Sequence, residues 1–133
     1  GVPLKSWQEL TNPNIVKIVI NQQNEALYFS RAPIPYPREK GELLTTLERK
    51  EGSIPSPSPY LRHLGVYAYR GAFLKAYPTL ASSPLETYEK LEQLRALYNG
   101  HKIQVEISSM MPPPGIDTQE DLQIAQTWLQ SQV

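Results

Sequence analysis

Apolar and aromatic residues are densest between residues 60 and 70, in the stretch YLRHLGVYAYR. From residue 64 to residue 69 the composition suits a largely buried β-strand. A period of two would give one face of that strand His63, Gly65, Tyr67 and Tyr69, and the other face Leu64, Val66 and Ala68. We therefore predict a central strand with one face in the core and the other forming the wall of a pocket.

Two other regions show strand patterns. Residues 15–20 (IVKIVI) are rich in β-branched side chains, residues 21–24 are polar turn material, and residues 26–30 (ALYFS) return as a second strand. This order predicts a β-hairpin. Near residues 103–107, isoleucine and valine alternate with polar neighbours, which predicts a half-buried strand. Residues 1–14 show little periodicity, and we interpret them as a lead-in to the first strand.

Three helices are predicted. Residues 71–77 suit a short helix that a proline ends. Residues 84–98 carry the clearest helix signals, because Ser83 and Glu86 form a capping-box pattern and an asparagine–glycine pair follows the last apolar position. The last helix starts at Thr118 with a threonine cap and an acidic first turn.

The interleaving of strands and helices predicts an α/β fold. We expect a mixed, mostly parallel sheet with flanking helices and an antiparallel element at the hairpin. Nine of the thirteen prolines lie in clusters at residues 33–37, 55–59 and 112–114, which mark stiff loops. We expect residues 1–133 to form a single partial domain, with a flexible loop at residues 39–59.

Composition narrows the classes of partner. Thirteen basic and thirteen acidic residues cancel, so the overall charge favours neither nucleic acid nor an anionic membrane surface. The chain has no cysteine, which excludes disulfides, thiolate zinc sites and a cysteine nucleophile. No apolar run has the length of a membrane span. We expect a soluble, cytoplasmic protein, and 133 residues are few for a complete enzyme with two substrates.

Four residues are candidates for a ligand-binding site, and two of them could bind an anion. Arg31 and Arg38 flank the first proline cluster, where a stiff loop could aim both guanidinium groups at one ligand. Solvated loop charges are the simpler interpretation of each arginine. His63 and Tyr67 share a face of the predicted strand. Both could equally be ordinary packing residues, because a histidine among apolar residues is more often a hydrogen-bonded core residue.

Three more residues could bind a ligand or a metal ion, or could have only a surface or helix-end role. Glu92 and Gln93 lie in the middle of a predicted helix, where they form either an exposed flank or a polar pair for a hydroxylated ligand. Asp117 precedes the threonine cap of the last helix and could either complement that helix end or bind Mg²⁺. No glycine-rich phosphate loop, Ser-His-Asp pattern or histidine-rich metal spacing is present.

The chain resembles the C-terminal half of the CTP:3-deoxy-manno-octulosonate (KDO) cytidylyltransferases. Four segments carry the resemblance through their shared order and spacing: residues 26–35 (ALYFSRAPIP), 60–70 (YLRHLGVYAYR), 91–97 (LEQLRAL) and 114–122 (PGIDTQEDL). The resemblance implies a nucleotide-diphospho-sugar transferase-like fold, of which only the C-terminal half would be present. It also implies an enzyme that joins KDO to CTP, giving CMP-KDO and pyrophosphate for lipopolysaccharide-type glycan synthesis.

The resemblance also assigns roles to single residues. Asp117 would bind Mg²⁺, and six residues would line the sugar-acid pocket: Arg31, Arg38, His63, Tyr67, Glu92 and Gln93. Guanidinium and imidazole groups suit a carboxylate, while a carboxylate and an amide suit hydroxyl groups. Metal ions would position the reacting groups and offset the charge that develops on pyrophosphate.

One departure from the family is large. Its cytosine and triphosphate site lies in the half that precedes these residues, so we expect the chain to be a truncation or proteolytic remnant that is inactive alone. We also expect an exposed sheet edge and self-association as a homodimer or larger assembly. Two alternatives remain open: a cytidylyltransferase for another sugar acid such as sialic acid, and a non-catalytic oligomerisation or sugar-acid-binding module.

Overall fold

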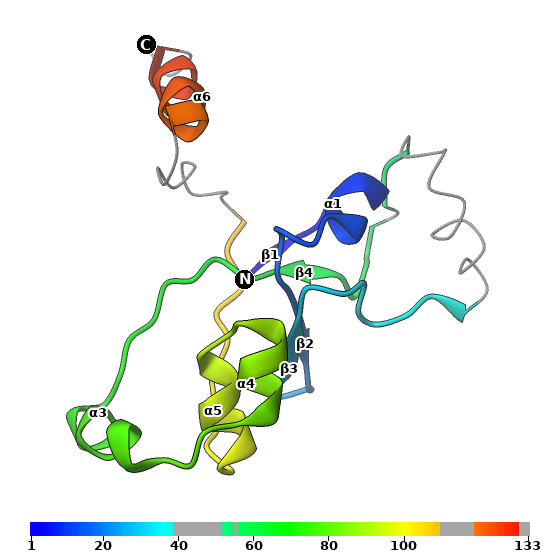
Figure 1. Cartoon of the computed structure of the whole chain (residues 1–133). Helices are drawn as coiled ribbons and strands as arrows, with labels where there is room; N and C mark the ends of the chain where they lie inside the picture. The colour runs from blue at the N-terminus through cyan, green and yellow to red at the C-terminus, as the bar shows by residue number, and fades with distance from the viewer. Residues whose placement is uncertain (39–51, 55, 110–118, 131–133) are drawn as a thin grey trace.

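Figure 1 shows the computed structural model of the chain, which describes residues 1–38, 52–54, 56–109 and 119–130. Along the chain the elements are β1 (Val2–Pro3), α1 (Trp7–Thr11), β2 (Lys17–Ile20), β3 (Ala26–Ser30), β4 (Leu61–Arg62), α3 (Gly71–Ala76), a 3₁₀ turn η2 (Tyr77–Thr79), α4 (Pro84–Glu89), α5 (Gln93–Tyr98) and α6 (Gln119–Gln130). None of these helices is long and apolar enough to cross a membrane.

The predicted hairpin is confirmed. Strands β2 and β3 pair in antiparallel register, with Ile18 opposite Phe29 and an irregularity after Val19. The Asn21 side-chain oxygen accepts hydrogen bonds from two backbone N–H groups of the turn, at 2.8 and 2.9 Å. Asn24 takes the left-handed conformation with φ 57°, which asparagine tolerates better than most residues. Local turn chemistry therefore explains why the chain reverses here.

The prediction of a mostly parallel sheet is wrong for the described residues. Four strands form one sheet in the order β1-β4-β2-β3, and all three pairings are antiparallel. The predicted strand at residues 64–69 is absent, because β4 ends at Arg62 and the chain then leaves the sheet. The predicted strand at residues 103–107 is reduced to an isolated antiparallel bridge between Glu25 and Gln104. The two segments expected to enlarge the sheet thus lie outside its ladders.

Residues 1–14 have more regular structure than their pattern suggests. Ser6 caps α1 by accepting a hydrogen bond from the Glu9 backbone N–H at 3.2 Å, and the Glu9 carboxylate accepts one from the Ser6 backbone N–H at 3.1 Å. This is a reciprocal capping box. Apolar side chains around α1 form a small core with buried residues Leu4, Leu10, Ile54 and Tyr60.

The larger core lies between the sheet and α5. Its buried members are Ile18, Ala26, Phe29, Leu61, Leu91, Leu94 and Val105. Phe29 is 1% exposed and Leu94 is fully buried. Burial of side chains of this size stabilises the fold by about 1.5–3 kcal/mol each. This core fixes α5 against β3, and so fixes the start of α5 at the edge of the candidate site.

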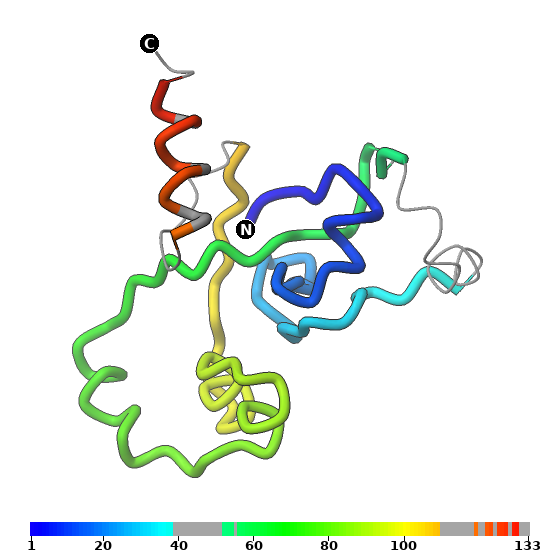
Figure 2. The backbone as a smooth tube through the Cα atoms, turned by 45° about the horizontal axis from the view of Figure 1, so that its top comes forward, coloured from blue at the N-terminus to red at the C-terminus, as the bar shows by residue number. Residues whose placement is uncertain are grey.

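The predicted helix at residues 84–98 is two helices. Ser83 caps α4 as expected, accepting hydrogen bonds from two backbone N–H groups. At Lys90 the backbone becomes left-handed, with φ 55°, and the chain restarts as α5 at Gln93. The predicted short helix is confirmed as α3, and α6 begins directly after Thr118, which lies outside the described residues. Both α3 and α6 stand apart from the sheet (Figures 1 and 2).

Candidate functional site

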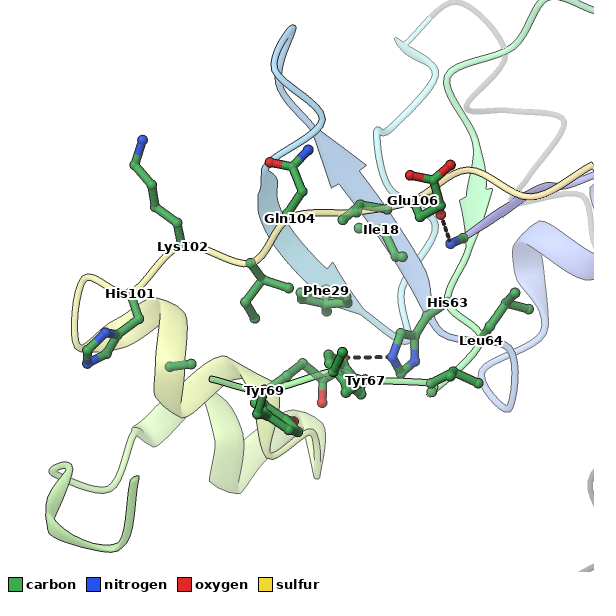
Figure 3. Close-up of a pocket in the computed structure, with 18 of the residues that line it drawn as sticks. Ile18, Phe29, His63, Leu64, Tyr67, Tyr69, His101, Lys102, Gln104 and Glu106 are labelled. Atoms are coloured by element: carbon green, nitrogen blue, oxygen red, sulfur yellow. Dashed lines mark hydrogen bonds between the residues drawn. The ribbon is translucent and has the colours of Figure 1, made fainter. Parts of the chain in front are cut away.

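A cavity of about 970 Å³ lies where the chain leaves the sheet after β4 (Figure 3). One wall is formed by residues 63–70, and the opposite wall by residues 101–106. Ile18 and Phe29 from the hairpin contribute apolar surface, and Gln93 and Ala96 come from α5. The cavity therefore lies between the sheet, α5 and the segment that follows β4 and contains α3.

His63 and Tyr67 meet in this cavity, as their spacing suggested. The His63 Nε2 atom and the Tyr67 hydroxyl are 2.7 Å apart, and Figure 3 shows this contact. The His63 ring also packs edge-on against Phe29, at 5.3 Å between ring centroids. Both side chains are half-buried. The pair is held from two sides even though residues 64–69 form no strand.

Burial sets the charge state of this pair. It lowers the pKa of the His63 imidazole below its usual value, and the Glu92 carboxylate opposes part of that shift. Burial also raises the pKa of the Tyr67 phenol well above its ordinary range. At neutral pH the site therefore offers a neutral imidazole and a neutral phenol. Such groups suit hydrogen bonds to a polar ligand.

Gln93, the first residue of α5, lines the same cavity. Its side chain is 3% exposed, and neither the amide nitrogen nor the amide oxygen has a hydrogen-bond partner among the described residues. A buried amide without partners costs about 1–3 kcal/mol, so native structures seldom contain one without a reason. The sequence pattern favours an exposed helix flank for Gln93. In the structure its side chain is buried, and its amide has no partner among the described residues.

Glu92 lies beside this site without lining it. Its side chain is exposed, and its backbone carbonyl accepts a hydrogen bond from the Tyr77 hydroxyl at 2.9 Å. The negative charge of Glu92 still acts on the pocket, because it opposes the lowered pKa of His63. Glu92 and Gln93 are therefore neighbours in sequence with different surroundings.

Arg31 has local partners in the structure. Its Nε donates to the Glu89 carbonyl at 2.8 Å, and one terminal nitrogen donates to the Pro13 carbonyl at 3.1 Å. The Glu89 carboxylate in turn accepts a hydrogen bond from the Arg31 backbone N–H at 2.9 Å. Arg31 joins the end of α4 to the segment after β3. Neither Arg31 nor the exposed Arg38 lines the cavity, and Asp117 lies outside the described residues.

A series of aromatic rings extends the pocket wall beyond Tyr67 and Tyr69, which the sequence placed there. Tyr69 stacks on Tyr67 with centroids 5.6 Å apart and on Phe73 with centroids 5.7 Å apart. Phe73 also meets His101 edge-on at 5.0 Å. All four rings line the cavity. A signal was present, since Tyr67, Tyr69 and Phe73 are close in sequence, but the partner His101 comes from a distant segment.

The cavity has few free charges. Lys102 lines it, but its ammonium group forms an ion pair with Glu25 at 2.8 Å, and Figure 3 shows the side chain pointing away from the cavity. Arg70 also lines the cavity and is exposed. Within the described ranges, no group of three or more His, Cys, Asp or Glu side chains could hold a metal ion. The described site is thus a mainly aromatic cavity with two imidazoles, phenols, the charged side chains of Arg70 and Glu106, and one unpaired amide.

Comparison with known proteins gives consistent results. The sequence model of the family described as cytidylyltransferase matches residues 1–103. A 3-deoxy-manno-octulosonate cytidylyltransferase of Neisseria meningitidis serogroup A is 49% identical over 119 residues, covering 90% of this chain and 45% of the relative. The protein of that name from Nitrosococcus oceani is 51% identical over 123 residues, covering 92% of this chain and 45% of the relative.

A solved structure agrees with these relatives. A CMP:2-keto-3-deoxy-manno-octonic acid synthetase complexed with CTP is 35% identical, with a TM-score of 0.77 over 99% of this chain and 49% of its own. The chain therefore shares the fold of that synthetase, and it spans about half the length of the relatives it matches. From the family match over residues 1–103, the chain belongs to the cytidylyltransferase family.

Proposed function

We propose that this chain supplies the sugar-acid-binding half of a CTP:3-deoxy-manno-octulosonate cytidylyltransferase. In the full reaction the anomeric oxygen of KDO forms a bond to the α-phosphorus of CTP. The bond from that phosphorus to the bridging oxygen breaks, pyrophosphate leaves, and the hydroxyl loses its proton. The products are CMP-KDO and pyrophosphate. Support comes from relatives that are 49% and 51% identical and carry this activity in their names.

The observation that carries the proposal is the unpaired amide of Gln93. A carboxamide has two donors and one acceptor, and here both of its polar atoms lack a partner among the described residues. A ligand with several hydroxyl groups would satisfy donor and acceptor together, and a sugar is such a ligand. The nearby His63 and Tyr67 pair adds further polar atoms on the same cavity.

These residues would orient the sugar and would form no covalent bond to it. Nucleotidyl transfer depends mainly on alignment of the attacking oxygen with the phosphorus, so positioning by hydrogen bonds is a sufficient role. Arg31 and Arg38 would contact the sugar carboxylate, as the family resemblance implies. Arg31 would then exchange its carbonyl partners at Glu89 and Pro13 for that carboxylate.

Further parts of the proposal rest on the resemblance alone. Asp117 would bind Mg²⁺, the chain would correspond to the C-terminal half of the enzyme, and the protein would be a cytoplasmic homodimer or larger assembly. Asp117 lies outside the described residues, which contain no group of three or more His, Cys, Asp or Glu side chains that could hold a metal ion. The CTP site would be completed by the part of the enzyme that residues 1–133 do not include.

Titration calorimetry tests the proposal. Residues 1–133 are titrated with KDO, with and without Mg²⁺, and with N-acetylneuraminate as the competing sugar acid. We expect one KDO per chain, weaker binding of N-acetylneuraminate, and no pyrophosphate release when CTP is added. The variant Gln93→Ala should bind KDO about tenfold more weakly, because it loses a donor and an acceptor whose hydrogen bonds are worth about 0.5–1.5 kcal/mol each.

The matched control is Gln8→Ala, which changes an exposed glutamine of α1 in the same way. It should leave KDO affinity unchanged. A folded chain that fails to bind KDO would overturn the proposal and favour a structural module. Preference for N-acetylneuraminate would move the substrate to another sugar acid. Pyrophosphate release by the chain alone would contradict the division of the enzyme into halves.

A further inference from the structure

Tyr77 connects three elements at the edge of the cavity. Its hydroxyl donates to the Glu92 carbonyl at 2.9 Å, and its ring packs against Phe73 with centroids 5.8 Å apart. The Arg95 guanidinium lies over the same ring, 5.1 Å from the centroid. The Tyr77 side chain therefore connects the segment that contains α3 to the first turn of α5, where Gln93 is located.

The Arg95 guanidinium is itself held in place. Its Nε and one terminal nitrogen donate to the two carboxylate oxygens of Glu86 at 2.8 and 2.7 Å. This bidentate geometry fixes the plane of the guanidinium better than a single bond would. Glu86 belongs to α4 and Arg95 to α5, so the pair bridges the break between these helices. Tyr77 packs on a rigid group.

The turn that Tyr77 contacts follows a strained residue and has no side-chain cap. Lys90 is left-handed with φ 55°, a conformation that costs a residue other than glycine roughly 1–2 kcal/mol. Glu92 caps α5 without any side-chain hydrogen bond. Its carbonyl accepts the Arg95 backbone N–H at 3.0 Å and the Tyr77 hydroxyl. Leu91 anchors this turn in the larger core, and the Tyr77 hydroxyl is the side-chain contact that holds the Glu92 carbonyl next to Gln93.

The phenol remains a donor under ordinary conditions. Burial raises the pKa of Tyr77 above its usual value, and the Arg95 charge opposes part of that rise. The carboxylates of Glu86 and Glu92, together with Tyr69, raise the pKa further. Tyr77 therefore keeps its proton at neutral pH, and its hydrogen bond to the Glu92 carbonyl persists.

We propose that Tyr77 is a positioning residue that holds the Glu92–Gln93 turn so that the Gln93 amide faces the cavity. This inference rests on the proposed sugar-acid site. Tyr77 does not need to touch the ligand in order to act. It sets the backbone from which Gln93 projects, and it ties the aromatic wall of the cavity to α5.

The test removes one oxygen atom. The variant Tyr77→Phe keeps the ring, its packing on Phe73 and the Arg95 contact, but loses the bond to the Glu92 carbonyl. The matched control is Tyr88→Phe, which deletes the same atom from a tyrosine that is 89% exposed. We expect Tyr77→Phe to weaken KDO binding about fivefold, the worth of one ordinary hydrogen bond, and Tyr88→Phe to have no effect.

A second readout does not depend on ligand. In ¹H–¹⁵N spectra, the side-chain amide resonances of Gln93 should shift in Tyr77→Phe and stay in place in Tyr88→Phe. The Arg95 backbone amide should exchange faster in the first variant only. If neither the resonances nor the exchange rate changes, or if KDO affinity is retained in Tyr77→Phe, the inference is overturned.

The two proposals can fail separately. If the unaltered chain does not bind KDO, the proposed function fails, while the Gln93 resonances still decide whether Tyr77 positions the turn. If Tyr77→Phe does not fold, Arg95→Lys replaces it, because lysine keeps the charge and loses the bidentate contact with Glu86. The same shift of the Gln93 resonances is then expected, and its absence would equally overturn the inference.

Discussion

The buried Gln93 amide has a cost in stability that can be measured. Both polar atoms of its amide are buried without partners among the described residues, which penalises the folded state. We expect Gln93→Leu, a change of similar volume, to raise the free energy of unfolding by about 1 kcal/mol and to abolish KDO binding. Urea denaturation and calorimetry of the same preparation measure both effects.

The variant Gln104→Leu is the control, because we expect it to change the free energy of unfolding in the opposite direction. The Gln104 side-chain nitrogen donates to the carbonyls of Gln23 and Asn24, at 2.8 and 3.2 Å. Gln104→Leu therefore deletes hydrogen bonds that exist, and we expect the free energy of unfolding to fall by roughly 0.5–1 kcal/mol. If Gln93→Leu lowers the free energy of unfolding as Gln104→Leu does, the Gln93 amide forms hydrogen bonds in solution without a ligand.

At the level of single residues, the sequence could indicate chemistry but not surroundings. The sequence pattern put His63 and Tyr67 on one face of a predicted strand, and they do meet, but the strand is absent and Gly65 between them has a left-handed φ of 71°. Gln93 looked like an exposed helix position, since its burial depends on a helix break several residues away. Arg31 was suited to an anion, and its carbonyl partners come from segments that only the folded chain brings near.

The break between α4 and α5 is an element-scale feature that can be tested. Lys90 has φ 55° and ψ 47°, a conformation that glycine adopts without a steric penalty. We expect Lys90→Gly to raise the free energy of unfolding by about 1 kcal/mol. In a continuous helix the same change would cost about 1 kcal/mol instead. The sign of the change in urea denaturation therefore distinguishes two helices from one.

A lysine inside a regular helix gives the reference for that measurement. Lys75 lies in α3 and is exposed. We expect Lys75→Gly to lower the free energy of unfolding by up to 1 kcal/mol, because glycine loses more conformational freedom in a helix. Equal destabilisation by both glycine variants would contradict the left-handed conformation at Lys90.

Residues 64–69 give a second element-scale expectation. Their sequence favours a strand, yet their backbone N–H groups make no hydrogen bond within the described part of the chain. We expect these amides to exchange with solvent at nearly the rate of an unfolded peptide, while amides of β2 are protected. Hydrogen-exchange mass spectrometry checks this. Protection of residues 64–69 would mean that they pair with another strand in solution, such as one from a second copy.

Elements stabilised by local interactions were predicted well, and those that need a distant partner were not. The hairpin and α3 follow from nearby turn and helix signals, so their positions agree with the sequence pattern. A strand needs a neighbour, and strand-forming composition at residues 64–69 cannot supply one. Lysine gives no signal for a left-handed break, which explains why α4 and α5 were expected as a single helix.

On the scale of the whole molecule, the sheet of the described residues is smaller than expected and its pairings are antiparallel. Its antiparallel pairings join strands of two to five residues, and the hairpin accounts for half of the paired positions. The expectation of parallel strands came from interleaved strand and helix patterns. Two of those patterns, residues 64–69 and 103–107, form no strand ladder. The crossover connections that join parallel strands are therefore not formed through them. The cavity lies beside these two segments, which links the reduced sheet to the candidate site.

The pH dependence of stability is a property of the whole chain that begins with Lys17. This side chain is fully buried, and its ammonium group donates to the carbonyls of Asn12 and Ile15 at 3.0 and 2.6 Å, and to that of Arg31. Burial lowers the pKa of Lys17 from 10.5 to about 8, although the Glu89 carboxylate opposes the shift. Between these values the unfolded chain binds more protons than the folded chain. Free energy of unfolding should therefore rise with pH from about 8 to 10.

Above that range the tyrosines reverse the slope. Burial raises the pKa values of Tyr60, Tyr67 and Tyr77 above 10.0, so the unfolded chain loses these protons first and stability falls as pH rises further. Urea denaturation followed by tryptophan fluorescence should thus show a maximum near pH 10. Lys17→Met should lower stability by roughly 3 kcal/mol at neutral pH, because three carbonyls lose their donor. It should also remove the rise below pH 10 and leave the fall above it, whereas an unchanged rise would mean that Lys17 is not its source.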